Sequence, residues 1–107
     1  MLDLRISDVN IVDGTGNLRY KADIGITNGK ITAIGSLSGS QSKLTIDATQ
    51  HVVSPGFIDS HSHSDFTLLV DPRAVSSITQ GVTAEVVGNC GYGSCPIANK
   101  AMAHEVI

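Results

Sequence analysis

The sequence predicts a mixed β and α/β fold, in which an all-β segment precedes a strand–helix–strand unit. Short apolar runs that alternate with polar residues, separated by turn residues, fill residues 2–54. At Ser54-Pro55-Gly56 this pattern gives way to two apolar segments with a helical pattern between them. We therefore expect one domain over residues 1–54 and a second over residues 55–107.

The first domain is expected to consist of short strands joined by tight turns. Asn28-Gly29 lies between two apolar runs and predicts a hairpin, because both central residues of a type I′ turn need positive φ. Residues 13–17 form a second turn cluster, and residues 35–43 a flexible surface loop. The expected strands cover residues 2–6, 9–12, 24–26, 30–34, 44–48 and 51–53.

The second domain is expected to be a βαβ unit. Residues 57–61 and 82–87 are mostly apolar, as strands buried in a parallel sheet would be. A loop follows the first strand, after which Asp71 is expected as N-cap and Pro72 as the first helical residue. Gly81 suits the end of that helix. A weak helical pattern begins again at Pro96.

Composition places the chain among globular proteins. Of its 107 residues 41% are hydrophobic and 16% charged, and the net charge of -3 argues against nucleic acid as a partner. No apolar run approaches the roughly 20 residues that cross a bilayer. The first residues lack the pattern of a signal peptide, so we expect a cytoplasmic protein without a membrane partner. Cys90 and Cys95 are then expected to be reduced thiols or metal ligands.

Two histidines and a cysteine form the candidate site. If the first strand extends through His61 and His63, their side chains point to the same side and can present both imidazoles to one ion. Cys90 follows the second strand, whose carboxyl end would lie at the same edge of a parallel sheet. Alternatively, the histidines are solvated loop residues and Cys90 is a small buried apolar residue.

Two carboxylates are candidates for orienting these histidines. Asp59 and Asp65 share the strand parity of the pair and could accept a hydrogen bond from an imidazole, although Asp65 also suits a loop or cap role. Cys95 lacks such a placement and is interpreted as structural. His51 and His104 have no partner at ligand spacing.

The segments around these residues resemble a known superfamily. Residues 53–63, Val-Ser-Pro-Gly-Phe-Ile-Asp-Ser-His-Ser-His, resemble the entry into the first barrel strand of the amidohydrolases, and residues 10–16 and 23–31 resemble their N-terminal β-sandwich segment. Residues 71–74, 80–83 and 88–91 (Gly-Asn-Cys-Gly) are similar to the N-acyl-D-amino-acid deacylases, or D-aminoacylases.

This resemblance implies a β-sandwich-type domain followed by the first βαβ portion of an incomplete TIM-like (β/α)8 barrel. It also implies zinc-dependent hydrolysis of the amide in an N-acyl-D-amino acid, a carbon–nitrogen bond other than a peptide bond. His61 and His63 would match the ligand pair of the first barrel strand, and Cys90 a further zinc ligand. The general base is expected beyond Ile107, so the resemblance assigns no catalytic residue to this chain.

Two other functions stay open at this point. A non-enzymatic structural or interaction module could have arisen from such a hydrolase, and its unpaired strand edges would favour self-association. A hydrolase of cyclic amides, similar to dihydroorotase or hydantoinase, would share the His-x-His pair, but the Gly-Asn-Cys-Gly loop counts against it. Under the deacylase hypothesis the isolated chain is expected to be inactive.

Overall fold

The computed structural model describes residues 1–93 of the chain. It divides into two compact units, Met1–Pro55 (unit 1) and Gly56–Ile107 (unit 2), which are described separately. No helix within residues 1–93 has the length and apolar character needed to cross a membrane. The weak helix expected from Pro96 onward lies outside the described residues.

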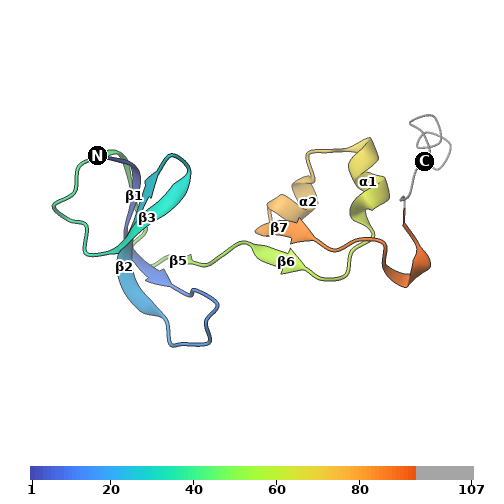
Figure 1. The fold of residues 1–107 in the computed structure, drawn as a ribbon, viewed down its shortest axis with the longest axis horizontal. Helices are drawn as coiled ribbons and strands as arrows, with labels where there is room; N and C mark the ends of the chain where they lie inside the picture. Colours follow the sequence, from blue (N-terminus) through green and yellow to red (C-terminus); the bar gives the residue numbers. More distant parts are fainter. Residues whose placement is uncertain (94–107) are drawn as a thin grey trace. The chain divides into compact units, whose positions relative to one another are not determined.

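Unit 1 is built around one five-stranded mixed sheet (Figure 1). Strand β1 is central and pairs antiparallel with β2, which pairs antiparallel with β3. On its other edge β1 pairs in parallel with β4 and then, further along, with β5. The strands are β1 (Leu2–Ile11), β2 (Tyr20–Thr27), β3 (Lys30–Gly35), β4 (Ser42–Asp47) and β5 (Val52–Val53).

The hairpin predicted at Asn28-Gly29 is confirmed. The two residues join β2 to β3 with φ values of 51° and 71°, the positive sign that a type I′ turn requires. The two strands expected over residues 2–6 and 9–12 are instead one strand. Its register shifts between Ile6 and Val9, and Asp8 has a φ of 59°, so a bulge lets β1 continue where the apolar alternation breaks.

The core of unit 1 lies where β1 and β2 meet the segment after β4. Val9 is completely buried, and Ile11, Ile24 and Ala48 are nearly so. Ile6, Ala22, Ile26 and Val53 pack around them. This small cluster holds the sheet together because it removes apolar side chains of three segments from water.

Unit 2 has the predicted strand–helix–strand order. The parallel pair β6 (Phe57–Asp59) and β7 (Val82–Glu85) is connected through helices α1 (Ser64–Val70) and α2 (Val75–Ile78), and a 3-10 turn, η1 (Asn89–Gly91), follows β7 (Figure 1). The predicted βαβ unit is therefore confirmed. The helix ends earlier than expected, at Ile78 with Thr79 as C-cap, and Gly81, with a φ of 82°, lies two residues beyond the cap.

Three details of unit 2 differ from the sequence-based expectation. Residues 64–70, expected as a loop, form α1, and Asp71 is the C-cap of that helix, not the N-cap of the next. The N-cap of α2 is Ala74, and Asp71 bonds the Arg73 guanidinium. The run from Ser64 to Val70 contains no glycine or proline, the two residues that oppose a helix most strongly.

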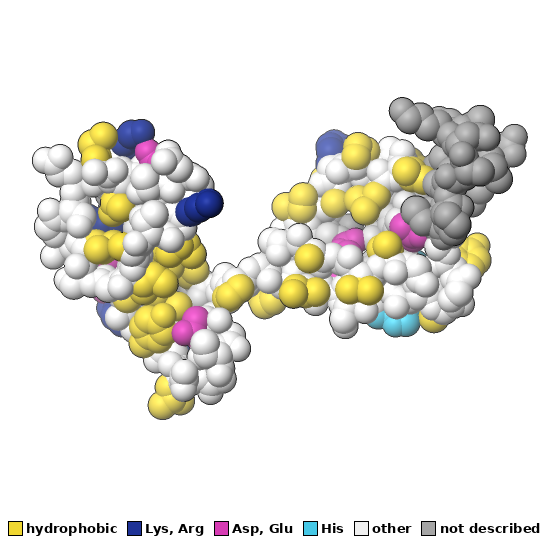
Figure 2. All heavy atoms as spheres, viewed as in Figure 1, with side chains coloured by type: hydrophobic (Ala, Val, Ile, Leu, Met, Phe, Trp, Pro, Cys, Tyr) yellow, Lys and Arg dark blue, Asp and Glu magenta, His cyan; other side chains and the backbone are white. Residues whose placement is uncertain are grey.

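The strands of unit 2 are not buried, contrary to expectation. Within the described part of this unit no residue is buried, and Phe57 and Ile58 are 59% and 70% exposed. Figure 2 shows apolar side chains spread over the visible surface of unit 2. The described residues comprise two strands and two short helices, too little structure to enclose both faces of a parallel pair.

Candidate metal centre

His61 and His63 lie in the loop between β6 and α1, not on a strand. Strand β6 ends at Asp59, and His63 is the N-cap residue of α1. The expectation that alternation along a strand would point both side chains to the same side is therefore wrong. Their rings nevertheless meet edge to face, with centroids 5.4 Å apart. A short loop between a strand and a helix brings them together instead.

Cys90 joins the two histidines in one cluster. Its Sγ atom lies 3.6 Å from Nε2 of His61. One ligand atom from each of the three residues lies within 4.8 Å of the other two. All three side chains are exposed, and histidine reaches the surface of unit 2 in Figure 2. The structure thus brings together the three residues that the sequence singled out.

The donor set suits zinc. In a tetrahedral site with ordinary bond lengths, a nitrogen and a sulfur ligand would lie about 3.6 Å apart, and two nitrogens about 3.3 Å. The sulfur–nitrogen distance from Cys90 to His61 matches the first value. Two imidazoles and one thiol leave one position of a four-coordinate ion for another group. The donor types and the one sulfur–nitrogen distance therefore fit a zinc ion, and the other donor atoms lie within 4.8 Å of one another.

The backbone at Cys90 has an unusual conformation. Cys90 lies in η1 with a φ of 59°, between Gly88 and Gly91, whose φ values are 79° and 69°. A cysteine in the left-handed region costs conformational energy, and such residues concentrate at functional sites. The two glycines accept positive φ without strain because they have no Cβ atom.

Hydrogen bonds connect the loop of the histidines to the end of β7. The Val86 N–H donates to the Asp59 carbonyl at 2.8 Å, and the Ser62 N–H donates to the Val86 carbonyl at 2.9 Å. The Asn89 side-chain amide donates to the carbonyls of Val86, at 2.8 Å, and Ser62, at 3.3 Å. These bonds join Ser62, which lies between the two histidines, to Val86 and to Asn89, which directly precedes Cys90.

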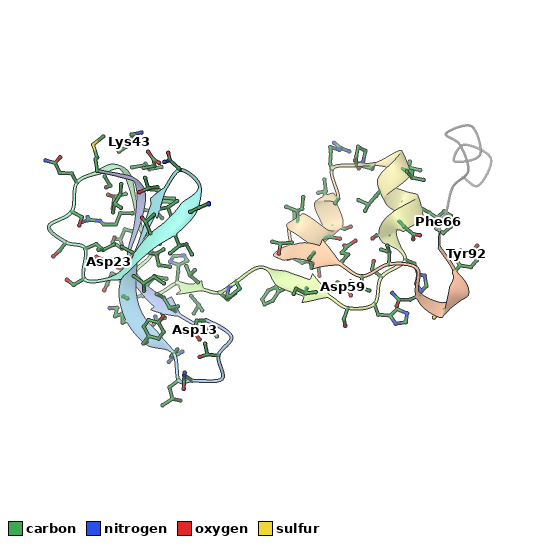
Figure 3. The ribbon with its side chains drawn as sticks, viewed as in Figure 1. Asp13, Asp23, Lys43, Asp59, Phe66 and Tyr92 are labelled. Atoms are coloured by element: carbon green, nitrogen blue, oxygen red, sulfur yellow. The ribbon has the colours of Figure 1, made fainter. Side chains whose placement is uncertain are left out.

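The two candidate carboxylates occupy different positions. Asp59 accepts the backbone N–H of His61 at 3.1 Å, so it holds the start of the loop (Figure 3). Asp65 lies in the first turn of α1, where its negative charge interacts favourably with the helix dipole and stabilises the helix. That either residue accepts a hydrogen bond from an imidazole stays a prediction.

Glu85 connects both helices to β7. Its carboxylate accepts hydrogen bonds from the hydroxyls of Ser64, the first residue of α1, and Ser77 in α2. These two bonds hold the pKa of Glu85 below its ordinary value. Because Ser64 follows His63 directly, Glu85 fixes the helix start beside a candidate ligand.

An aromatic pair flanks the cluster. The Tyr92 ring lies 6.4 Å from that of His63 and 5.5 Å from that of Phe66, centroid to centroid. Figure 3 shows Phe66 on α1 and Tyr92 on the segment that follows η1. The pair forms an apolar border on one side of the cluster.

Sequence reasoning missed Asn89 and Glu85. Asn89 was noticed only as part of Gly-Asn-Cys-Gly, although asparagine beside glycine commonly bonds nearby backbone groups in turns. Glu85 is the single charged residue in a mostly apolar strand, and such a residue is expected to have a hydrogen-bonding partner nearby. Cys95 and His104 lie outside the described residues.

Comparison with known proteins gives matches along most of the chain. The profile of the Amidohydrolase family matches residues 44–102. The N-acyl-D-glutamate deacylase of Alcaligenes xylosoxydans xylosoxydans is 42% identical over 95 residues, which are 89% of this chain and 20% of that protein. The D-aminoacylase of the same organism is 40% identical over 97 residues, 91% of this chain and 20% of the relative.

Solved structures agree with these relatives. A D-aminoacylase crystal structure matches with a TM-score of 0.85 at 42% identity, over 92% of this chain and 21% of that one. The N-acyl-D-glutamate deacylase of Bordetella bronchiseptica, complexed with zinc and a phosphonate that mimics the tetrahedral intermediate, matches with a TM-score of 0.81 at 42% identity, over 89% and 20%. The chain thus spans about a fifth of the length of the relatives it matches. The predicted fold class, a β domain followed by the start of an amidohydrolase barrel, is confirmed.

Proposed function

We propose, because this chain belongs to the amidohydrolase family, that it forms part of a zinc-dependent hydrolase of N-acyl-D-amino acids. The observation that carries the proposal is the cluster of His61, His63 and Cys90, whose donor atoms lie within 4.8 Å of one another. Deacylases of N-acyl-D-glutamate and of other N-acyl-D-amino acids supply the matching sequences and structures. These relatives are the reason for proposing this substrate class.

Within this proposal the three side chains hold the metal. His61 and His63 would each supply one imidazole nitrogen, and Cys90 its sulfur as the thiolate. When bound, zinc would polarise the amide carbonyl and bring the pKa of a water molecule toward neutrality. An acid–base group for the leaving amine is part of the same chemistry, and we assign it to the rest of the complete enzyme.

The remaining residues of the site keep the ligands in place. Asp59 holds the loop backbone at His61, and Glu85 holds the helix that starts after His63. The exposed Tyr92, next to His63 and Phe66, offers an apolar surface against which part of a substrate could pack. These groups bind and orient; none of them is assigned a proton transfer.

A cyclic-amide hydrolase is the second candidate. The D-hydantoinase of Ralstonia pickettii is 38% identical over 90 residues, and a D-hydantoinase structure matches with a TM-score of 0.63 at 32% identity. The hydantoinase TM-score is lower than the 0.85 and 0.81 of the D-aminoacylase and N-acyl-D-glutamate deacylase structures, whose identity to this chain is 42%. We therefore favour the linear N-acyl-D-amino acid as substrate.

A chimera tests the proposal directly. The matching segment of the Alcaligenes N-acyl-D-glutamate deacylase, 95 residues long, is replaced with that of this chain, and the hydrolysis of N-acetyl-D-glutamate and of hydantoin is measured. A second chimera carries Cys90→Ala, and a third carries His51→Ala as a matched surface control.

We expect the first and third chimeras to bind zinc and to release D-glutamate, while the Cys90→Ala chimera loses at least about 100-fold in kcat/KM. Hydrolysis of hydantoin alone would favour the second candidate. A correctly folded first chimera without bound zinc would contradict the assignment of the three ligands. The chain of 107 residues alone is expected to give no deacylase turnover.

A further inference from the structure

We infer that Asn89 is a positioning residue that holds the loop of His61 and His63 against the loop of Cys90. The inference rests on the proposed function and extends it from the metal ligands to the residue that sets their spacing. The two hydrogen bonds that the Asn89 amide donates go to backbone carbonyls and to none of the three donor atoms. Asn89 acts through the backbone on either side of them.

The contacts of the Asn89 amide define this role. Its Nδ2 atom lies 2.8 Å from the Val86 carbonyl oxygen and 3.3 Å from the Ser62 carbonyl oxygen. A side-chain amide nitrogen carries two hydrogens, so it can donate one to each carbonyl. Ser62 stands between the two histidines, and Asn89 directly precedes Cys90. One side chain therefore bridges the two segments that supply the candidate ligands.

The Ser62 peptide is held at both ends. Its N–H donates to the Val86 carbonyl at 2.9 Å, and its C=O accepts from Asn89. Both backbone groups of Ser62 are thus tied to the segment after β7, at Val86 and at Asn89. Because the histidines flank this residue, a shift of Ser62 would change the direction of both imidazoles.

The backbone around Cys90 is irregular, so strand pairing does not fix its position. Cys90 has a φ of 59°, and Gly88 and Gly91 on either side also have positive φ. Such a segment lacks the regular backbone pairing of a strand, so side-chain bonds carry more of its order. Half-buried Asn89 supplies two of those bonds.

Substitution at Asn89 tests the inference. Asn89→Asp keeps the shape but replaces the donor with a charged acceptor facing two carbonyl oxygens, and Asn89→Ala removes the side chain without adding charge. Asn10→Asp is the matched control, because the Asn10 amide also donates to a backbone carbonyl, that of His51 at 3.4 Å, but in unit 1.

Three measurements are made on the chain of 107 residues. Zinc affinity is obtained by competition with a chelator. The near-ultraviolet charge-transfer band of the Co²⁺-loaded protein, with Cys95→Ser in every variant, reports whether the Cys90 thiolate coordinates the metal. Amide hydrogen exchange at Val86, whose N–H bonds the Asp59 carbonyl, reports whether β6 and β7 stay paired.

We expect both Asn89 variants to lose about 10- to 100-fold in zinc affinity and to weaken the charge-transfer band, with Val86 still protected. Asn10→Asp should match the unmodified chain in all three measurements. Unchanged affinity and band in the Asn89 variants would overturn the inference while the metal centre stands. Loss of Val86 protection in both variants would also overturn it, since Asn89 would then serve strand pairing. An unmodified chain that binds neither zinc nor Co²⁺ would remove the proposed metal centre itself.

Discussion

A methyl group on Gly56 should separate the two strands on which the candidate site is built. A Cβ atom placed at Gly56 would lie 2.2 Å from both Cγ2 and Oγ1 of Thr83 and 2.7 Å from its Cβ. Gly56 directly precedes β6, and Thr83 lies in β7. Gly56→Ala therefore forces a collision at the edge of the strand pair.

The size of the effect follows from which contacts can relax. Rotation of the Thr83 side chain can move Cγ2 and Oγ1, but the contact with Cβ at 2.7 Å persists unless the backbones part. Overpacking of this kind costs about 1–3 kcal/mol, and a contact that only backbone movement relieves belongs at the upper end. We expect Gly56→Ala to lower the stability of the β6–β7 pair by about 3 kcal/mol.

Amide exchange at Val86 and zinc affinity measure the result. We expect faster exchange at Val86 and weaker zinc binding in Gly56→Ala, because the histidine loop follows β6 and Cys90 follows β7. Gly39→Ala is the control, since a Cβ there meets no atom within 4 Å. Combining Gly56→Ala with Thr83→Gly removes all three colliding atoms and should bring both quantities back to those of Thr83→Gly alone, since glycine itself weakens a strand. If Gly56→Ala alone matches the unmodified chain, the reasoning is refuted.

Three further predictions concern single groups. Asp23 accepts the backbone N–H groups of Asp8 and Leu37, each at 2.9 Å, so Asp23→Ala should cost unit 1 about 2–3 kcal/mol in urea unfolding; an unchanged midpoint would contradict this. The pKa of Glu85 is lowered by hydrogen bonds from Ser64 and, less strongly, from Ser77. The stability that ionised Glu85 gives to unit 2 is therefore present above its ordinary pKa of 4.5 and is lost as the pH falls through the lower pKa of the folded state. Glu85→Gln should remove that acid-dependent loss in unit 2. Zinc at a hundred times its dissociation constant should stabilise unit 2 by about 2.7 kcal/mol, reversibly with a chelator, and an equal gain in unit 1 would argue against a site in unit 2.

Local chemistry made parts of the fold predictable. Asn28-Gly29 specified its turn because few residues accept two successive positive φ values. The bulge at Asp8 was not predictable, because it depends on the carboxylate of Asp23, 15 residues away, which accepts the Asp8 N–H. Alternation breaks at a bulge, so one strand looked like two.

The sequence singled out the three residues that the structure brings together, but it assigned two of them the wrong local geometry. His61 and His63 were placed on a strand, whereas a loop and the start of α1 carry them. Residue type and spacing indicate which groups could bind a metal, and this does not depend on the exact secondary structure. The bridge formed by Asn89 requires the three-dimensional pairing of Ser62 with Val86, which no local pattern reports.

Zinc titration of the unmodified chain by calorimetry, beside Cys90→Ser, His63→Ala and His51→Ala, tests the central claim most directly. The account predicts one zinc ion per chain, a loss of affinity in the first two variants, and none in the third, because His51 is an exposed histidine of unit 1. Absence of zinc binding, or binding that Cys90→Ser and His63→Ala leave unchanged, would contradict it.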